Sequence, residues 1–98
     1  MFVGILDVDL LLPSDVRSLK DKRGHVRGLM AELRRRFDVA AAEAGHLDLH
    51  RRTLVGVAVV SPDLAHCREV LDACERLVAA RPELEVIAAR QRFVGDDD

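Results

Sequence analysis

Three polar side chains that alternate along the chain, His46, Asp48 and His50, are of types that can hold a metal ion. In an extended segment alternate side chains point the same way, and two imidazoles with a carboxylate are ligands that Zn²⁺ accepts. In a polar hairpin loop, however, solvated side chains are the simpler explanation. We therefore assign no metal site and no cofactor, and keep this triplet as an alternative.

Hydroxyl groups that could act as nucleophiles are scarce, and none lies in a motif that would activate it. The topology predicted below also occurs in acylphosphatases, which need a glycine-rich phosphate loop after the first strand. The corresponding segment here, Leu11–Arg17, has no glycine. The sequence therefore predicts a protein that is not an enzyme.

The two cysteines, Cys67 and Cys74, lie seven residues apart within a helical pattern. Their separation along a helix is about 10 Å, which is too far for a disulfide within that helix. No neighbouring base or CxxC spacing marks either of them as reactive. We expect both to be buried structural thiols.

Basic residues are concentrated in one segment. Residues 17–36 contain eight basic and two acidic residues, a local net charge of +6, whereas the whole chain carries −2. Such a cluster can supply the phosphate contacts that dominate affinity for nucleic acids. A solvated helix face, with arginines placed favourably near the helix C-terminus, is the alternative explanation.

The rest of the sequence limits how RNA could bind. Recognition on a sheet surface needs aromatic side chains, and the only aromatics are Phe2, Phe37 and Phe93. Asp7 and Asp9 are expected on the uncovered sheet face, where their charge would repel phosphate. RNA would therefore meet the basic helix and the adjacent loops. Gly24 and Gly28 leave a strip without side chains on this helix, which either admits a phosphate backbone or another helix or has no role.

The elements that must position these residues follow from hydrophobic periodicity. Strands are predicted over 2–12, 38–44, 53–60 and 84–94. Helices are predicted from Leu19, with Ser18 as N-cap, and after Ser61-Pro62-Asp63, with Ser61 as N-cap and Pro62 in the first turn. This order predicts an α+β fold, a ferredoxin-like βαββαβ sandwich in which a four-stranded antiparallel sheet carries both helices on one face.

Within these elements, one apolar stripe should pack the first helix on the sheet: Leu19, Val26, Met30, Leu33 and Phe37. The opposite, uncovered face of the sheet should expose apolar side chains, including Val3, Ile5, Val57 and Ile87. An uncovered apolar face of this kind favours a protein partner or a second copy of the chain.

Length and composition fit one domain over residues 1–94, followed by a mobile acidic tail at 95–98. The first residues show neither the basic start nor the long apolar run of a signal peptide. No stretch approaches the roughly 20 apolar residues of a membrane span. We expect a cytoplasmic protein that does not enter a membrane.

Three motifs together resemble the YlxP-like family of small bacterial proteins of unassigned function: Ser18–Arg23, Leu33–Val39 and Gly56–Ser61. The resemblance extends over nearly the whole chain. It implies a ferredoxin-like fold. Because genes of this family commonly accompany those of translation initiation and ribosome-binding factors, it also implies a role in translation or ribosome maturation. The chain departs from the family at Gly24, where relatives often carry a basic residue, and at His50, where they commonly carry an aromatic one.

These observations predict a non-enzymatic factor that binds ribosomal RNA or a ribosomal subunit through its basic first helix. The alternative is a protein-interaction or homodimerisation module that uses the uncovered sheet face without nucleic acid. The residues expected to contact RNA are Lys20, Lys22, Arg23, Arg27, Arg34, Arg35, Arg36, Arg51 and Arg52.

Overall fold

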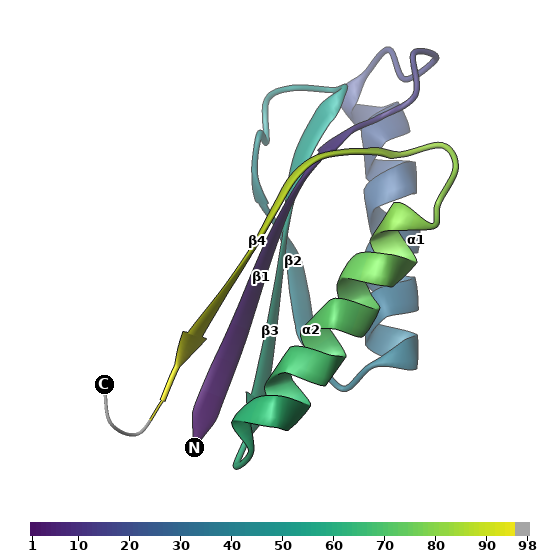
Figure 1. Cartoon of the computed structure of the whole chain (residues 1–98). Coiled ribbons are helices and arrows are strands. Elements are labelled where there is room, and N and C mark those ends of the chain that lie inside the picture. Colours follow the sequence, from purple (N-terminus) through teal and green to yellow (C-terminus); the bar gives the residue numbers. More distant parts are fainter. Residues whose placement is uncertain (96–98) are drawn as a thin grey trace.

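The computed structural model describes residues 1–95 and has the predicted order of elements (Figure 1). The acidic tail expected to be mobile lies, apart from Gly95, outside the described residues. The elements are β1 (Phe2–Leu11), α1 (Leu19–Arg36), β2 (Ala40–Gly45), β3 (Arg52–Ser61), α2 (Leu64–Ala79) and β4 (Glu85–Val94).

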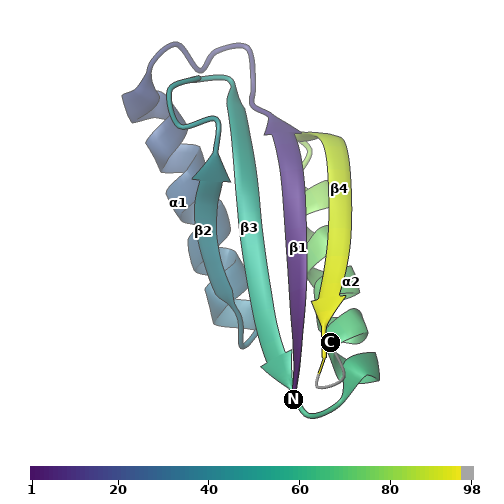
Figure 2. The same cartoon turned by 90° about the vertical axis from the view of Figure 1, so that its left-hand side faces the viewer.

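All four strands form one antiparallel sheet in the order β2-β3-β1-β4. Both helices cover the same face of this sheet, and its other face is open (Figures 1 and 2). Helix α1 packs mainly against β2, while α2 lies across β1, β3 and β4. This arrangement confirms the ferredoxin-like fold.

The core forms between the sheet and the helices because apolar residues alternate along the two central strands. Leu6, Val8 and Leu10 of β1 are fully buried on this side. Val57 of β3 is buried there too, so its predicted place on the uncovered face was wrong. The prediction failed because β3 is apolar on both faces, so hydrophobicity alone does not show which of its alternate residues point towards the helices.

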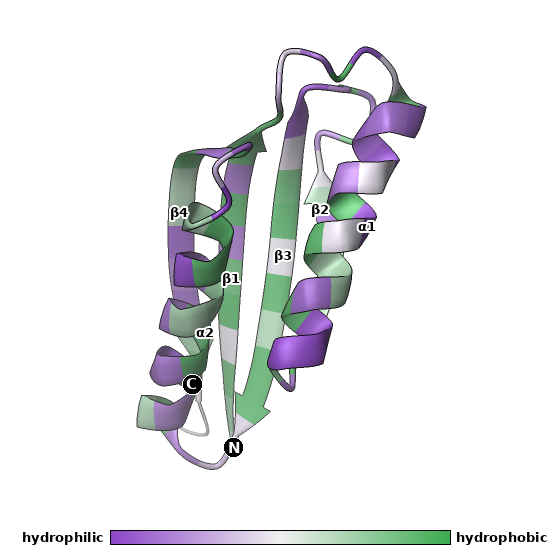
Figure 3. Cartoon of the chain, turned by 90° about the vertical axis from the view of Figure 1, so that its right-hand side faces the viewer, coloured by the Kyte–Doolittle hydropathy of each residue, from purple (hydrophilic) through white to green (hydrophobic). Residues whose placement is uncertain are grey.

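Helix α1 begins as predicted, with the Ser18 hydroxyl accepting a hydrogen bond from the Asp21 amide at 3.1 Å. Its buried face consists of Lys22, Val26, Leu29, Met30 and Leu33. Leu19, expected in the apolar stripe, is instead 43 % exposed at the first position of the helix. Three arginines in the last turn complement the negative end of the helix dipole (Figure 3).

Helix α2 starts later than predicted. Its N-cap is Asp63, whose carboxylate accepts from the Ala65 amide at 2.9 Å. Ser61 ends β3, and its hydroxyl accepts from the Asp63 amide instead. Pro62 therefore precedes the cap, because the Asp63 carboxylate satisfies the free amide of the second helical residue, Ala65.

The start of one strand differs from the sequence-based prediction, and one shift in strand register was not predicted. Strand β2 begins at Ala40, two residues later than expected, because α1 runs to Arg36 and needs a short extended connection. In β4, the register with β1 shifts between Asp9 and Leu10, which leaves Ile87 without a partner residue and 46 % exposed. Within residues 1–95, neither helix is long and apolar enough to cross a membrane.

Candidate nucleic-acid interface

Lys22, which was predicted to contact RNA, is buried beneath the loop between β2 and β3, with its side chain 2 % exposed. Its ammonium group donates to the backbone carbonyls of His46 and Leu49, both at 2.7 Å, and pairs with the Glu43 carboxylate at 2.7 Å. These three contacts use all three ammonium protons. Lys22 therefore fixes the loop and is not available to a phosphate group.

Sequence reasoning missed this lysine although a signal was present. Lys22 precedes Val26, Leu29 and Leu33 at spacings of four, three and four residues, which places it on the buried face of the helix. A cation within such a pattern must find partners inside the fold. Glu43 and the loop carbonyls provide them, but only the folded chain brings them close.

Four other basic residues of α1 are exposed along one flank of the helix. At 3.6 residues per turn and a rise of 1.5 Å, their positions fall within about 60° of the helix circumference and extend over about 21 Å. We call this set the basic flank: Lys20, Arg23, Arg27 and Arg34.

The basic flank lies beside β2, because the Arg34 guanidinium donates a hydrogen bond to the Ala41 backbone carbonyl of that strand. The opposite flank of α1 faces the segment after α2, where Glu32 pairs with Arg81 at 3.3 Å. One side of the helix is thus cationic, and the other is occupied by internal ion pairs.

Among residues 1–95, Lys20, Arg23 and Arg27 have no carboxylate partner. Arg35 is 72 % exposed and lies 3.7 Å from Glu32, a distance typical of a weak surface pair. The Arg36 guanidinium is 6.0 Å from the centre of the Phe37 ring. These exposed cations near both ends of α1 can accept anionic groups from outside the chain.

The two arginines predicted from the β2–β3 connection do not join the basic flank. Arg51 donates to the Leu12 carbonyl at 3.1 Å and so ties this connection to the end of β1. Arg52 lies on the open sheet face, where it donates to both carboxylate oxygens of Asp9 at 3.2 and 2.7 Å. The charge of Arg52 is paired with Asp9, whereas Arg51 is held by a backbone carbonyl, and neither arginine lies on the basic flank.

The metal triplet does not assemble. His46 has a left-handed backbone with φ of 57°, and its Nε2 lies 3.3 Å from an Asp9 carboxylate oxygen. Throughout the described range, 1–95, no three His, Cys, Asp or Glu side chains form a group that could hold a metal ion. The turn at His46 breaks the extended geometry that the spacing of His46, Asp48 and His50 required.

Asp9 is the centre of a charged cluster on the open sheet face. The hydrogen bond from Arg52 lowers the pKa of Asp9 from its ordinary value of 3.8; partial burial opposes this shift, and the Arg52 charge and His46 add to it. Asp7, two residues earlier, pairs with Arg90 at 3.5 Å and with Arg92 at 3.6 Å. The carboxylates on this face are thus neutralised by neighbouring arginines.

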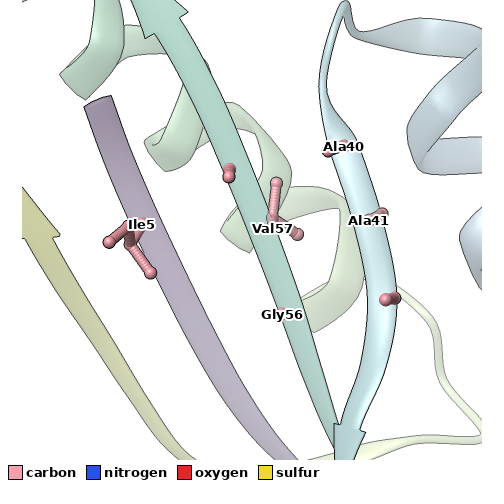
Figure 4. A pocket seen from close by; sticks show the side chains of 7 residues that line it. Ile5, Ala40, Ala41, Gly56 and Val57 are labelled. Carbon is pink, nitrogen blue, oxygen red and sulfur yellow. The ribbon is translucent and has the colours of Figure 1, made fainter. Parts of the chain in front are cut away.

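The remainder of the open face is apolar and nearly flat. Ile5 of β1 and the small residues Ala40, Ala42, Gly56 and Ala58 of β2 and β3 line a shallow hollow of about 280 Å³ (Figure 4). Val3 lies beside Val60 and Val94 at one end of the sheet. Among the described residues, those that form this surface carry no group for acid–base or nucleophilic chemistry.

Both cysteines are buried and free, as predicted. Burial raises the pKa of the Cys74 thiol to about 11. A thiol with such a pKa is almost entirely protonated at neutral pH and is a poor nucleophile.

Comparison with known proteins supports the resemblance inferred from the three motifs. Residues 3–91 match the model of a family described as "Protein of unknown function (DUF503)". The chain is also 30% identical over 91 residues to "Uncharacterized protein YlxP" of Bacillus subtilis (strain 168), and the match covers 93% of this chain and 98% of that protein.

Proposed function

The chain belongs to the DUF503 family of proteins of unknown function, and from that premise we propose that it is a non-enzymatic RNA- or ribosome-associated factor. The observation that carries this proposal is the basic flank of α1. All four of its cations are exposed and lack a carboxylate partner within residues 1–95, and Arg34 donates to a backbone carbonyl instead. Exposed cations in a row can each neutralise a backbone phosphate and release its counterion.

The rest of the fold acts as a scaffold in this proposal. The Lys22 contacts hold the first half of α1 to the β2–β3 loop, and the Arg34 contact holds its second half to β2. A helix fixed at both ends presents its cations without a large loss of conformational freedom on binding. Because the partner would be read through its phosphates, selectivity would depend on the shape of the RNA.

The experiment compares wild-type protein with a neutralised flank variant, Lys20→Gln with Arg23→Gln and Arg27→Gln. A matched control removes three charges elsewhere, with Arg68→Gln, Arg76→Gln and Arg90→Gln. Binding to ribosomal subunits and to purified ribosomal RNA is measured for each by sedimentation and filter retention. We expect loss of binding in the flank variant only; equal binding by all three proteins would overturn the proposal.

The open sheet face supports a second candidate, a protein-interaction or homodimerisation module. Val60 and Val94 are 61 % and 49 % exposed beside the apolar hollow, which is unusual for side chains of this type in one area. If a second copy covers this face, sedimentation at high salt should show twice the 10.9 kDa chain mass. Ala58→Arg in the hollow should then give a monomer, and a monomeric wild type would exclude the homodimer.

A further inference from the structure

The outer edge of β2 is the feature from which a further site follows. β2 is a terminal strand of the sheet. The Ala42 carbonyl lies on the side of Gly56 in β3, 3.8 Å from where a Gly56 side chain would begin. Since successive residues of a strand point their peptide groups to opposite sides, the amide and carbonyl of Ala41 face outward.

In the part of the chain that the structure describes, one side chain donates a hydrogen bond to that outward edge. The Arg34 guanidinium donates to the Ala41 carbonyl, and no other described residue outside the sheet does so. A charged side chain over an edge strand is a common way to prevent uncontrolled strand pairing. Unlike a backbone partner, a guanidinium on one carbonyl can move away when a stronger acceptor, such as a carboxylate, is offered.

The surroundings define what could pair with this edge. Seen from the open face, α1 projects beyond β2 (Figure 2). If a strand is added to β2, every second side chain of that strand will therefore face the basic flank of α1. Its other side chains would continue the open face beside Ala40 and Ala42, which are small and apolar. An extended segment with acidic residues at alternate positions, separated by apolar ones, matches both sides.

Charge argues against a second copy of this chain as the occupant. Pairing of β2 with β2 of another copy would place two basic flanks side by side, with eight like charges across a single strand pair. Such an arrangement is destabilising unless salt screens it. An acidic segment of a different protein replaces this repulsion with attraction.

We propose that the outer edge of β2 is a docking site for an extended acidic segment of a partner protein, which adds a fifth strand to the sheet. On binding, the Ala41 carbonyl exchanges Arg34 for a backbone amide of the segment, and Arg34 pairs with one of its carboxylates. This mode of recognition takes affinity from main-chain hydrogen bonds and selectivity from alternate side chains. It does not depend on RNA binding.

The test uses an eight-residue peptide, capped at both ends, in which aspartate and valine alternate. Two control peptides have the same composition: one groups the aspartates in a block, and the other is N-methylated at alternate residues so that it cannot pair with a strand edge. Binding to ¹⁵N-labelled full-length protein is followed by NMR shifts and by amide exchange at Ala41 and Glu43.

We expect saturable shifts at β2 and slower exchange at the outward amides with the alternating peptide. The N-methylated peptide should bind about tenfold more weakly, because it loses main-chain hydrogen bonds. Arg23→Gln with Arg27→Gln should weaken binding severalfold, whereas Arg76→Gln on α2 should not. Equal binding of all three peptides with shifts confined to α1 would show a simple polyanion surface and overturn the proposal, as would the absence of saturable shifts.

Discussion

Lys22 and Glu43 form an ion pair in which Nζ lies 2.7 Å from Oε2, although the lysine side chain is 2 % exposed. The same carboxylate oxygen accepts a hydrogen bond from the Thr53 hydroxyl at 2.7 Å. This cluster joins α1 to β2, β3 and the loop between those strands. The most basic helix of the chain therefore uses one of its cations to build the fold and presents others to solvent.

Lys22→Met should destabilise the protein by about 3 kcal/mol, because it leaves a partly buried carboxylate and two loop carbonyls without their donor. Lys20→Met, on the exposed flank two residues earlier, should change stability by less than about 0.5 kcal/mol. Urea unfolding followed by circular dichroism measures both values. Similar free energies for the two variants would contradict the structural role of Lys22.

A matched second variant separates the ion pair from the loop contacts. Lys22→Met combined with Glu43→Leu removes both charges, so the double variant should be more stable than Lys22→Met alone by about 1 kcal/mol or more. The remaining deficit reports the unsatisfied carbonyls of His46 and Leu49 together with the buried Thr53 hydroxyl, which loses its acceptor when Glu43 is replaced. A strictly additive loss in the double variant would mean that the two side chains do not interact.

The free energy of unfolding should decrease at acidic pH, in part because Asp9 becomes protonated. The pKa of this group is lowered in the folded state, so it contributes stability above its ordinary value of 3.8 and loses that contribution as the pH falls through the lower, folded value. Because Asp9 is partly exposed, the contribution should be about 1 kcal/mol or less. Asp9→Asn should unfold with a shallower pH dependence between about pH 5 and 2.5. An unchanged dependence would exclude Asp9 as a contributor.

Alanine substitutions should have opposite effects on stability at the glycines of α1 and at a glycine of the sheet. Within residues 1–95, apart from the adjacent residues and the local helix backbone, no atom lies within 4 Å of a Cβ added at Gly24 or Gly28. Alanine at either position should therefore stabilise the protein by up to about 1 kcal/mol. Gly4→Ala is the control, because its Cβ would lie 2.9 Å from a Leu71 methyl group and should destabilise by about 1–3 kcal/mol. If the alanine variants at Gly24 and Gly28 still bind RNA, the strip without side chains at these two positions does not contact it.

The thiols should be unreactive while the chain is folded. The pKa of Cys74 is raised from 9.0 to about 11 by burial, and Cys67 is fully buried. Ellman's reagent near neutral pH should label both at least about 100-fold more slowly in buffer than in denaturant. Stability should also decrease as the pH rises from 9 towards 11, because only the unfolded Cys74 thiol ionises in that range. Rapid labelling of the native chain would contradict this burial.

The fold could be predicted from the sequence because it depends largely on local patterns, which are the same in the sequence and in the folded chain. The alternation of Leu6, Val8 and Leu10 and the Ser18 cap are visible in the sequence because neighbours along the chain decide them. Strand β3 was different: with apolar residues on both faces, only its pairing with β1 shows that Val57 points inward.

The candidate site was less predictable, because the sequence shows which residues of the helix are basic but not whether each one is buried or exposed in the fold. Lys22 and Lys20 are two positions apart, yet one is enclosed by Glu43 and two carbonyls while the other faces solvent. Arg52 was assigned with the basic helix, but its partner Asp9 is distant in sequence and lies on the opposite face of the sheet. Contacts between distant segments decide which cations remain available.

The salt dependence of RNA binding tests the central claim most directly. If the basic flank and the exposed arginines at the end of α1 neutralise about four phosphates of a single strand, log K should fall with log salt at a slope of about −3, or about 50-fold between 50 and 200 mM. Neutralising Lys20, Arg23 and Arg27 should reduce that slope by about two and weaken binding to all sequences alike. A slope near zero, or one that the three substitutions leave unchanged, would contradict phosphate binding by α1.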